Sequence, residues 1–270
     1  MDNVFFAFIL TLLAGLSTGI GGATALLSHK TNTKFLSLGL GFSAGVMVYI
    51  SMTELFFEAR NVLSVAYGLK PGVLYATLAF FSGMLLIALI DKAVPSPENP
   101  HEIQHVCNIH DPRGQRGHED PKLLRMGLFT ALVVAIHNFP EGLATFISAL
   151  QQPSIAIPIT LAIAIHNVPE GIAIAIPVYY ATGDKRKAFG YAFLSGLSEP
   201  AGALIGYLIL RPYMSDTLFG LLFAAIAGIM VFISLDELLP SAREYGEHHL
   251  SIYGLIAGMA IMAFSLWLFL

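Results

Sequence analysis

Long apolar stretches separated by short polar segments make up most of this chain. About 20 apolar residues are enough for a helix to cross a bilayer, and the sequence contains eight stretches of that order. Their approximate limits are 4–28, 34–58, 72–93, 123–150, 155–182, 187–210, 214–239 and 250–270. The pattern predicts an all-α polytopic membrane protein with eight transmembrane helices, forming a single transmembrane domain over residues 1–270. The first stretch has no basic leading segment and is too long for a signal-peptide core, so we expect a retained spanning helix.

A polar segment at 94–121 separates the third stretch from the fourth. It is rich in proline and charge and lacks periodicity, which is typical of a flexible loop. Its four histidines, near Cys107, are His101, His105, His110 and His118. Neutral imidazoles bind zinc-class ions. Two interpretations stay open: weak regulatory capture of metal by these histidines, and an inert linker.

Composition and charge narrow the class of protein. Hydrophobic residues make up 56% of the chain and charged residues 12%, whereas a soluble domain has roughly 25% charged residues. The formal net charge of −4 provides no attraction to nucleic acid. The single cysteine excludes an intrachain disulfide. The expected environment is therefore a lipid bilayer, with no nucleic-acid partner.

Basic residues predict the orientation of the helices. Alternating crossings place the loops near 29–34, 93–125, 183–187 and 240–249 on one side, together with eleven of the fourteen Lys and Arg residues. By the positive-inside rule that side is cytoplasmic. We therefore expect both termini to face outward from a plasma membrane, with the His-containing loop in the cytoplasm.

A repeated hexapeptide carries the candidate chemistry. His137-Asn138-Phe139-Pro140-Glu141-Gly142 lies in the fourth stretch, and His166-Asn167-Val168-Pro169-Glu170-Gly171 lies in the fifth. His and Glu four positions apart share a helix face. Proline removes one helical hydrogen bond, so we expect the helices to unwind at Pro140 and Pro169 and to expose carbonyls to an ion.

Ionisable groups in the membrane need partners. Each costs about 2.5–3.5 kcal/mol at the helix centre, and five are expected there: His137, Glu141, His166, Glu170 and Glu199. A divalent cation offsets the carboxylates, and the amide oxygens of Asn138 and Asn167 add ligands without charge. The short loop near Pro153 makes the fourth and fifth helices antiparallel, so both motifs meet near the midplane. A proton relay and purely structural hydrogen bonding are the alternatives.

Other polar and small residues extend this interpretation. Glu54 lies close to the outer end of the second stretch, and Asp236 and Glu237 lie at the cytoplasmic end of the seventh. These acids fit either an entrance and exit for cations or solvated helix ends. Glycines four residues apart occur in helices one, two, six and eight, namely Gly15 and Gly19, Gly41 and Gly45, Gly202 and Gly206, and Gly254 and Gly258. Such spacing predicts close helix packing.

The doubled motif, Glu199 in Ser-Glu-Pro, the eight stretches and the His-bearing loop resemble the ZIP (Zrt/Irt-like) metal transporter family, most of all its bacterial zinc-uptake branch, the ZupT-like permeases. The resemblance covers the whole chain. It implies inverted repeats, formed by helices 1–3 and 6–8, around a central helix 4–5 pair. It also implies import into the cytoplasm across a bacterial inner membrane, and it is compatible with a homodimer.

The resemblance further implies a binuclear metal centre. His137, Glu141, His166 and Glu170 match one metal site of the family. Asn138, Asn167 and Glu199 match the second, with one Glu shared between the two.

The resulting hypothesis is a secondary carrier, not an enzyme. It moves Zn²⁺, and also Fe²⁺, Mn²⁺ or Cd²⁺, inward by alternating access, since ligand type alone does not exclude these metals. The sequence contains no nucleotide-binding motif. The alternative is an intramembrane zinc-dependent hydrolase, in which a Glu activates water. The HExxH pattern is absent, and hydrolysis has no use for the repeated motif.

Overall fold

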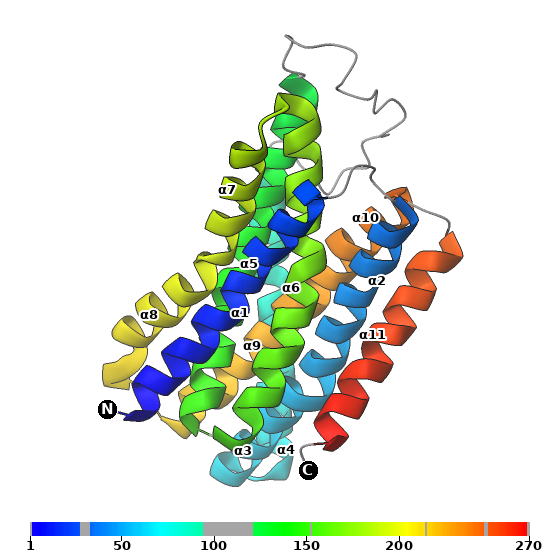
Figure 1. Ribbon diagram of the computed structural model, residues 1–270. Helices are drawn as coiled ribbons and strands as arrows, with labels where there is room; N and C mark the ends of the chain where they lie inside the picture. The colour runs from blue at the N-terminus through cyan, green and yellow to red at the C-terminus, as the bar shows by residue number, and fades with distance from the viewer. Residues whose placement is uncertain are drawn as a thin grey trace.

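The computed structural model describes residues 2–27, 33–93, 121–151, 153–213, 215–245 and 248–268 (Figure 1). Every regular element in these ranges is a helix, which confirms the all-α prediction. The elements are α1 (Asp2–Leu27), α2 (Thr33–Ile50), η1 (Ser51–Leu55), α3 (Phe56–Tyr67), α4 (Leu69–Ala93), α5 (Pro121–Gln151), α6 (Pro153–Thr182), α7 (Lys185–Gly196), α8 (Ser198–Leu210), η4 (Arg211–Tyr213), α9 (Asp216–Ile233), η5 (Ser234–Leu238), α10 (Leu239–Tyr245) and α11 (His248–Leu268).

Seven helical stretches in the described part of the chain are long and apolar enough to cross a membrane. Helix α5 covers the expected fourth span as a continuous helix of 31 residues but is not one of the seven. The count of eight spans therefore stays a prediction. The loop histidines His101, His105, His110 and His118 lie outside the described residues.

Two spans are longer than expected, and each contains a π turn. The second runs through α2, η1 and α3, and the seventh runs through α9, η5 and α10. The π turns η1 and η5 have similar sequences, Ser-Met-Thr-Glu-Leu and Ser-Leu-Asp-Glu-Leu. The likeness extends over residues 50–60 and 233–243, both of which begin with Ile and end with Ala-Arg. Such turns are rare and frequently occur at functional sites.

The expected unwinding at the motif prolines is wrong. Pro140 lies inside α5, and α6 continues through Pro169 without a break. Proline still leaves the carbonyl four residues earlier without its helical donor. In a membrane bundle, groups on neighbouring helices can satisfy the freed carbonyl, so the helix need not unwind.

The helices pack as two groups (Figure 1). The first bundle consists of α1, α5, α6, α7 and α8, and the second bundle consists of α2, α3, α4, α9, α10 and α11. They meet mainly where α2 lies against α6, with a smaller contact between α5 and α9.

Glycines bring α2 and α11 into backbone contact, as their spacing predicted. A methyl group at Gly41 or Gly45 would collide with the α11 backbone, at Ser251 and Leu255. In return, one at Gly254 or Gly258 would collide with the α2 backbone. This reciprocal approach is the packing that small residues four apart allow in lipid.

Candidate metal centre

Both hexapeptides lie in the packed interior, on α5 and α6. Their described polar side chains are excluded from solvent together with Glu199 on α8: Asn138, Glu141, His166, Asn167, Glu170 and Glu199 are each 0% exposed. The side chain of His137 lies outside the described part of the structure. Six of the seven side chains that are expected to bind metal are therefore described, and all six are buried.

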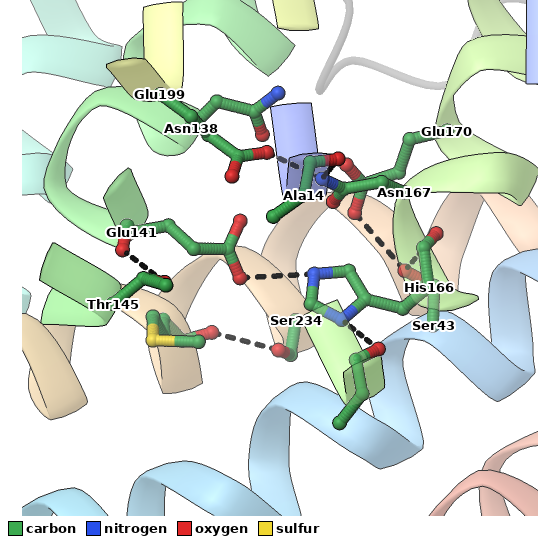
Figure 2. A network of polar contacts seen from close by, with 12 residues as sticks. Ala14, Ser43, Asn138, Glu141, Thr145, His166, Asn167, Glu170, Glu199 and Ser234 are labelled. Carbon is green, nitrogen blue, oxygen red and sulfur yellow. Dashed lines mark hydrogen bonds and ion pairs between the residues drawn. The ribbon is translucent and has the colours of Figure 1, made fainter. Parts of the chain in front are cut away.

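His166 and Glu141 form the closest pair between the two motifs. Oε1 of Glu141 lies 2.9 Å from Nε2 of His166, and Nδ1 of His166 lies 3.2 Å from the carbonyl oxygen of Ala162 (Figure 2). Because a carbonyl only accepts, Nδ1 carries the hydrogen, and Nε2 is the nitrogen available to a metal. When the imidazole is neutral, a lone pair of Nε2 faces a lone pair of Oε1 at this distance, and the two repel each other. The contact becomes favourable when a proton or a metal ion lies between the two atoms.

Asn167 joins α6 to α8 and α1. Its Nδ2 donates to Oε1 of Glu199 and, over 3.1 Å, to the carbonyl oxygen of Ala14. On α5, Nδ2 of Asn138 donates over 3.5 Å to the carbonyl oxygen of Ser195. Both amide groups are thus oriented by their NH₂ ends, which leaves their oxygens to face other groups.

Several buried oxygens in this region lack a hydrogen-bond donor. Among the described residues, nothing donates to Oδ1 of Asn138, Oδ1 of Asn167 or Oε2 of Glu141. A buried acceptor without a partner costs about 1–3 kcal/mol. Figure 2 shows Asn138, Asn167 and Glu199 grouped together, with Glu141 and His166 beside them. A set that is rich in acceptors suits a cation.

Glu199 lies in the first turn of α8, at its N-terminal end. Leu197, between α7 and α8, keeps a helical backbone, and its N–H donates to the carbonyl of Phe193 while its own carbonyl accepts from the N–H of Ala201. The two helices therefore form one apolar stretch, Lys185–Tyr213, that is long enough to cross a membrane, as the sequence predicted for the sixth span.

The motif glycines set how closely the helices approach, a role that the sequence analysis did not assign. A methyl group at Gly142 would collide with the backbone of Glu199, and one at Gly171 would collide with the backbone of Thr18 and Gly22 on α1. Gly142 therefore allows α8 to lie directly against α5 at Glu199, the third carboxylate.

Ser43 is the functional candidate that sequence reasoning missed. It lies on α2 in the second bundle, and its Oγ donates over 3.0 Å to Oε1 of Glu170. The same Oγ lies 3.3 Å from the carbonyl oxygen of His166. The only signal in the sequence is a serine within an apolar helix, and Ser37 on the same helix shares that signal.

The described side chains do not form one closed cluster. No three of the described His, Cys, Asp and Glu side chains gather in a way that would hold an ion by themselves. The expected donors instead form the pair Glu141 and His166, the group around Asn167, and Glu170 held by Ser43 (Figure 2). The amide NH₂ groups connect the motifs to their surroundings, Asn167 to Glu199 and Ala14, and Asn138 to Ser195.

The remaining candidate acids lie in the two π turns. Glu54 is half-buried in η1, Asp236 is half-buried in η5, and Glu237 is buried in η5. Each turn contacts the other helix, η1 against α9 and η5 against α2. Because its span continues to Tyr67, Glu54 lies near the middle of the span, whereas the sequence had predicted a position close to its end.

Comparison with known proteins leads to the same family that the doubled hexapeptide resembles. The family model described as ZIP zinc transporter matches residues 90–266. A protein of Clostridium perfringens named zinc transporter ZupT is 58% identical, over 100% of this chain and 98% of that protein. The protein of the same name from Streptococcus mutans is 60% identical, over 100% of this chain and 99% of that protein. The match at this level over the full length, together with the doubled motif in a buried site, shows that the chain belongs to the ZIP zinc transporter family.

Proposed function

We propose that this chain imports Zn²⁺ into the cytoplasm by alternating access around the buried centre on α5, α6 and α8. The observation that carries the proposal is the set of buried acceptors without donors, Oδ1 of Asn138, Oδ1 of Asn167 and Oε2 of Glu141, beside the His166 imidazole. Zn²⁺ takes imidazole nitrogen and carboxylate oxygen as ligands. The names of the relatives, zinc transporters, support the same substrate.

In this proposal the centre holds two ions. His166 Nε2 and Glu141 Oε1, joined by His137 and Glu170, bind the first ion. The second takes Glu199 and the two amide oxygens of Asn138 and Asn167. Glu141 is the shared carboxylate, because Oε1 faces His166 while Oε2 has no donor among the described residues. Both ions are cargo, so the ligand set must release them as well as bind them.

The same centre is proposed to accept Fe²⁺, Mn²⁺ and Cd²⁺. Nitrogen and oxygen donors are shared by most of these ions, and affinity for such ligands generally varies in a common order across the first-row divalent metals. The amide oxygens keep the net negative charge of the site low, so exchange between ions remains feasible.

The path to and from the centre is proposed to follow the two π turns. Glu54 in η1 attracts cations on the outer side of the centre, and Asp236 and Glu237 in η5 accept them on the cytoplasmic side. The likeness between 50–60 and 233–243 supports an inverted repeat of helices 1–3 and 6–8 within eight spans. In this topology both termini face outward. The 94–121 loop is cytoplasmic, where its four histidines bind metal weakly. A homodimer is part of the same proposal.

Uptake of ⁶⁵Zn²⁺ into proteoliposomes tests the function directly. We expect saturable uptake that is absent from protein-free vesicles, and we expect Cd²⁺, Fe²⁺ and Mn²⁺ to compete to different extents. A protein that accumulates no zinc, or that hydrolyses a lipid or peptide in a zinc-dependent manner without ion flux, would refute the proposal.

Ser43→Ala is expected to raise the KM for zinc about fivefold, the effect of one hydrogen bond worth about 1 kcal/mol. The change removes the donor that orients Glu170. Ser37→Ala is the matched control, because Ser37 is equally buried on α2 and its Oγ has no hydrogen-bond partner in the described chain. Equal KM values for the two variants would show that Ser43 does not position Glu170.

A further inference from the structure

An apolar cavity of about 380 Å³ lies between the two bundles, next to the first hexapeptide. It is lined by Leu86, Ile87 and Ile90 of α4, by Ala135, Ile136, Phe139 and Pro140 of α5, and by Ile229 of α9. None of these residues has a polar side chain. An apolar cavity of about 150 Å³ stays dry and binds apolar ligands. This larger cavity therefore favours an apolar occupant over water.

The cavity opens on the surface that faces lipid. Leu86 and Ile90 at its rim are 53% and 40% exposed, whereas Ile87 and Ile229 at its floor are each 8% exposed. Helix α4 is long and apolar enough to span a membrane, and only 22% of an 18-residue apolar segment within it is buried. Hydrocarbon chains are the molecules that meet an exposed apolar helix face within a bilayer.

The position of the cavity along α4 indicates which leaflet it faces. Lys92 lies exposed in the last turn of α4, and a lysine near a helix end extends its ammonium to the headgroups. Leu86 precedes Lys92 by six residues, about 9 Å along the helix axis. A lipid with its headgroup level with Lys92 thus places the upper part of its chain at the mouth of the cavity.

The lining of the cavity favours a hydrocarbon chain. Such a chain has no hydrogen-bonding group, so a lining without polar side chains leaves none of its atoms unsatisfied. We propose that the cavity binds one acyl chain of a phospholipid from the leaflet at the Lys92 end of α4, held between α5 of the first bundle and α4 and α9 of the second.

This binding site adjoins the metal centre. Phe139 and Pro140 line the cavity, while Asn138 and Glu141, their neighbours in the same turn of α5, are buried donors of the centre. An acyl chain in the cavity therefore contacts the turn of α5 that carries those donors. The effect of the lipid on zinc uptake rests on the proposed function, whereas occupancy of the cavity does not.

Photolabelling with a phosphatidylcholine that carries a diazirine on its acyl chain tests occupancy. The full-length protein is reconstituted in nanodiscs without zinc, irradiated and mapped by mass spectrometry. We expect labelling at Ile229, together with labelling at the freely exposed Leu208 and Ile209 of α8. Ala135→Phe fills the cavity and is expected to lose the Ile229 label while it keeps the α8 label. Ala260→Phe, on the exposed face of α11, is the matched control and keeps both labels.

Two results would overturn the proposal. The first is labelling of α8 without labelling of Ile229 in the wild-type protein. The second is an Ile229 label that is unchanged in Ala135→Phe. Since no zinc is used, a failed uptake assay leaves the labelling result unaffected.

Discussion

Zinc uptake into proteoliposomes is expected to fall to the background of empty vesicles in the His166→Ala variant. The imidazole Nε2 lies 2.9 Å from Glu141 and joins the α6 motif to the α5 motif. Loss of a partner outside the direct ligand shell already costs about 10–100-fold in metal affinity, so loss of a proposed ligand should cost more. The measurements are the initial rate of ⁶⁵Zn²⁺ uptake and zinc affinity by calorimetry in detergent.

His249→Ala is the matched control for this experiment. His249 is exposed near the start of α11 and is outside the network in Figure 2, so its loss is expected to leave uptake unchanged. Both variants should elute as the wild-type protein does on size exclusion. If folded His166→Ala transports zinc at the wild-type rate, His166 is not a ligand of the cargo, and the proposed centre is wrong.

Gly142→Ala is expected to lower both thermal stability and zinc uptake. The added methyl group would collide with the backbone of Glu199, so α5 and α8 must separate. Overpacking of this kind typically costs about 1–3 kcal/mol, and each kcal/mol lowers Tm by about 2–4 °C in a chain of 150–250 residues. The separation also moves Glu199 away from Asn138 and Asn167. Tm in detergent and the uptake rate report the two effects.

Gly190→Ala provides the control for the glycine experiment. Gly190 lies within α7, and a methyl group there would meet no atom within 4 Å. Alanine is favoured over glycine in a helix by up to about 1 kcal/mol, so this variant should be at least as stable as the wild-type protein. Equal Tm values for Gly142→Ala and Gly190→Ala would contradict the assigned role of Gly142.

The candidate ligands of the proposed site could be selected from the sequence because their signal is local. Two copies of one hexapeptide place His and Glu on a helix face, and the apolar surroundings make every ionisable residue conspicuous. Burial of Glu141, His166 and Glu170 followed from this reasoning alone, and the structure agrees. The limits of the helices also followed from local hydrophobicity, apart from the two spans that contain π turns.

The remaining features depend on contacts between distant parts of the chain. Ser43 and Glu170 are 127 residues apart, and no pattern along one helix distinguishes Ser43 from Ser37. The contact of Gly142 with Glu199 depends on how α5 packs against α8. The prediction of unwinding at the prolines failed for a related reason. Each proline removes one helical hydrogen bond wherever it lies, but the surrounding helices determine whether the backbone unwinds.

The two π turns also affect how the faces of their helices are arranged. A π turn corresponds to an α-helix with one inserted residue, and one residue of an α-helix turns the chain by about 100°. Past Leu55 and Leu238, the buried face of each helix is therefore shifted around the axis from the face that precedes the turn. A deletion of one residue within either turn would restore a regular helix and rotate Glu54 or Glu237 relative to the rest of the span. The length of these segments, and not only their composition, therefore determines which direction the acids face.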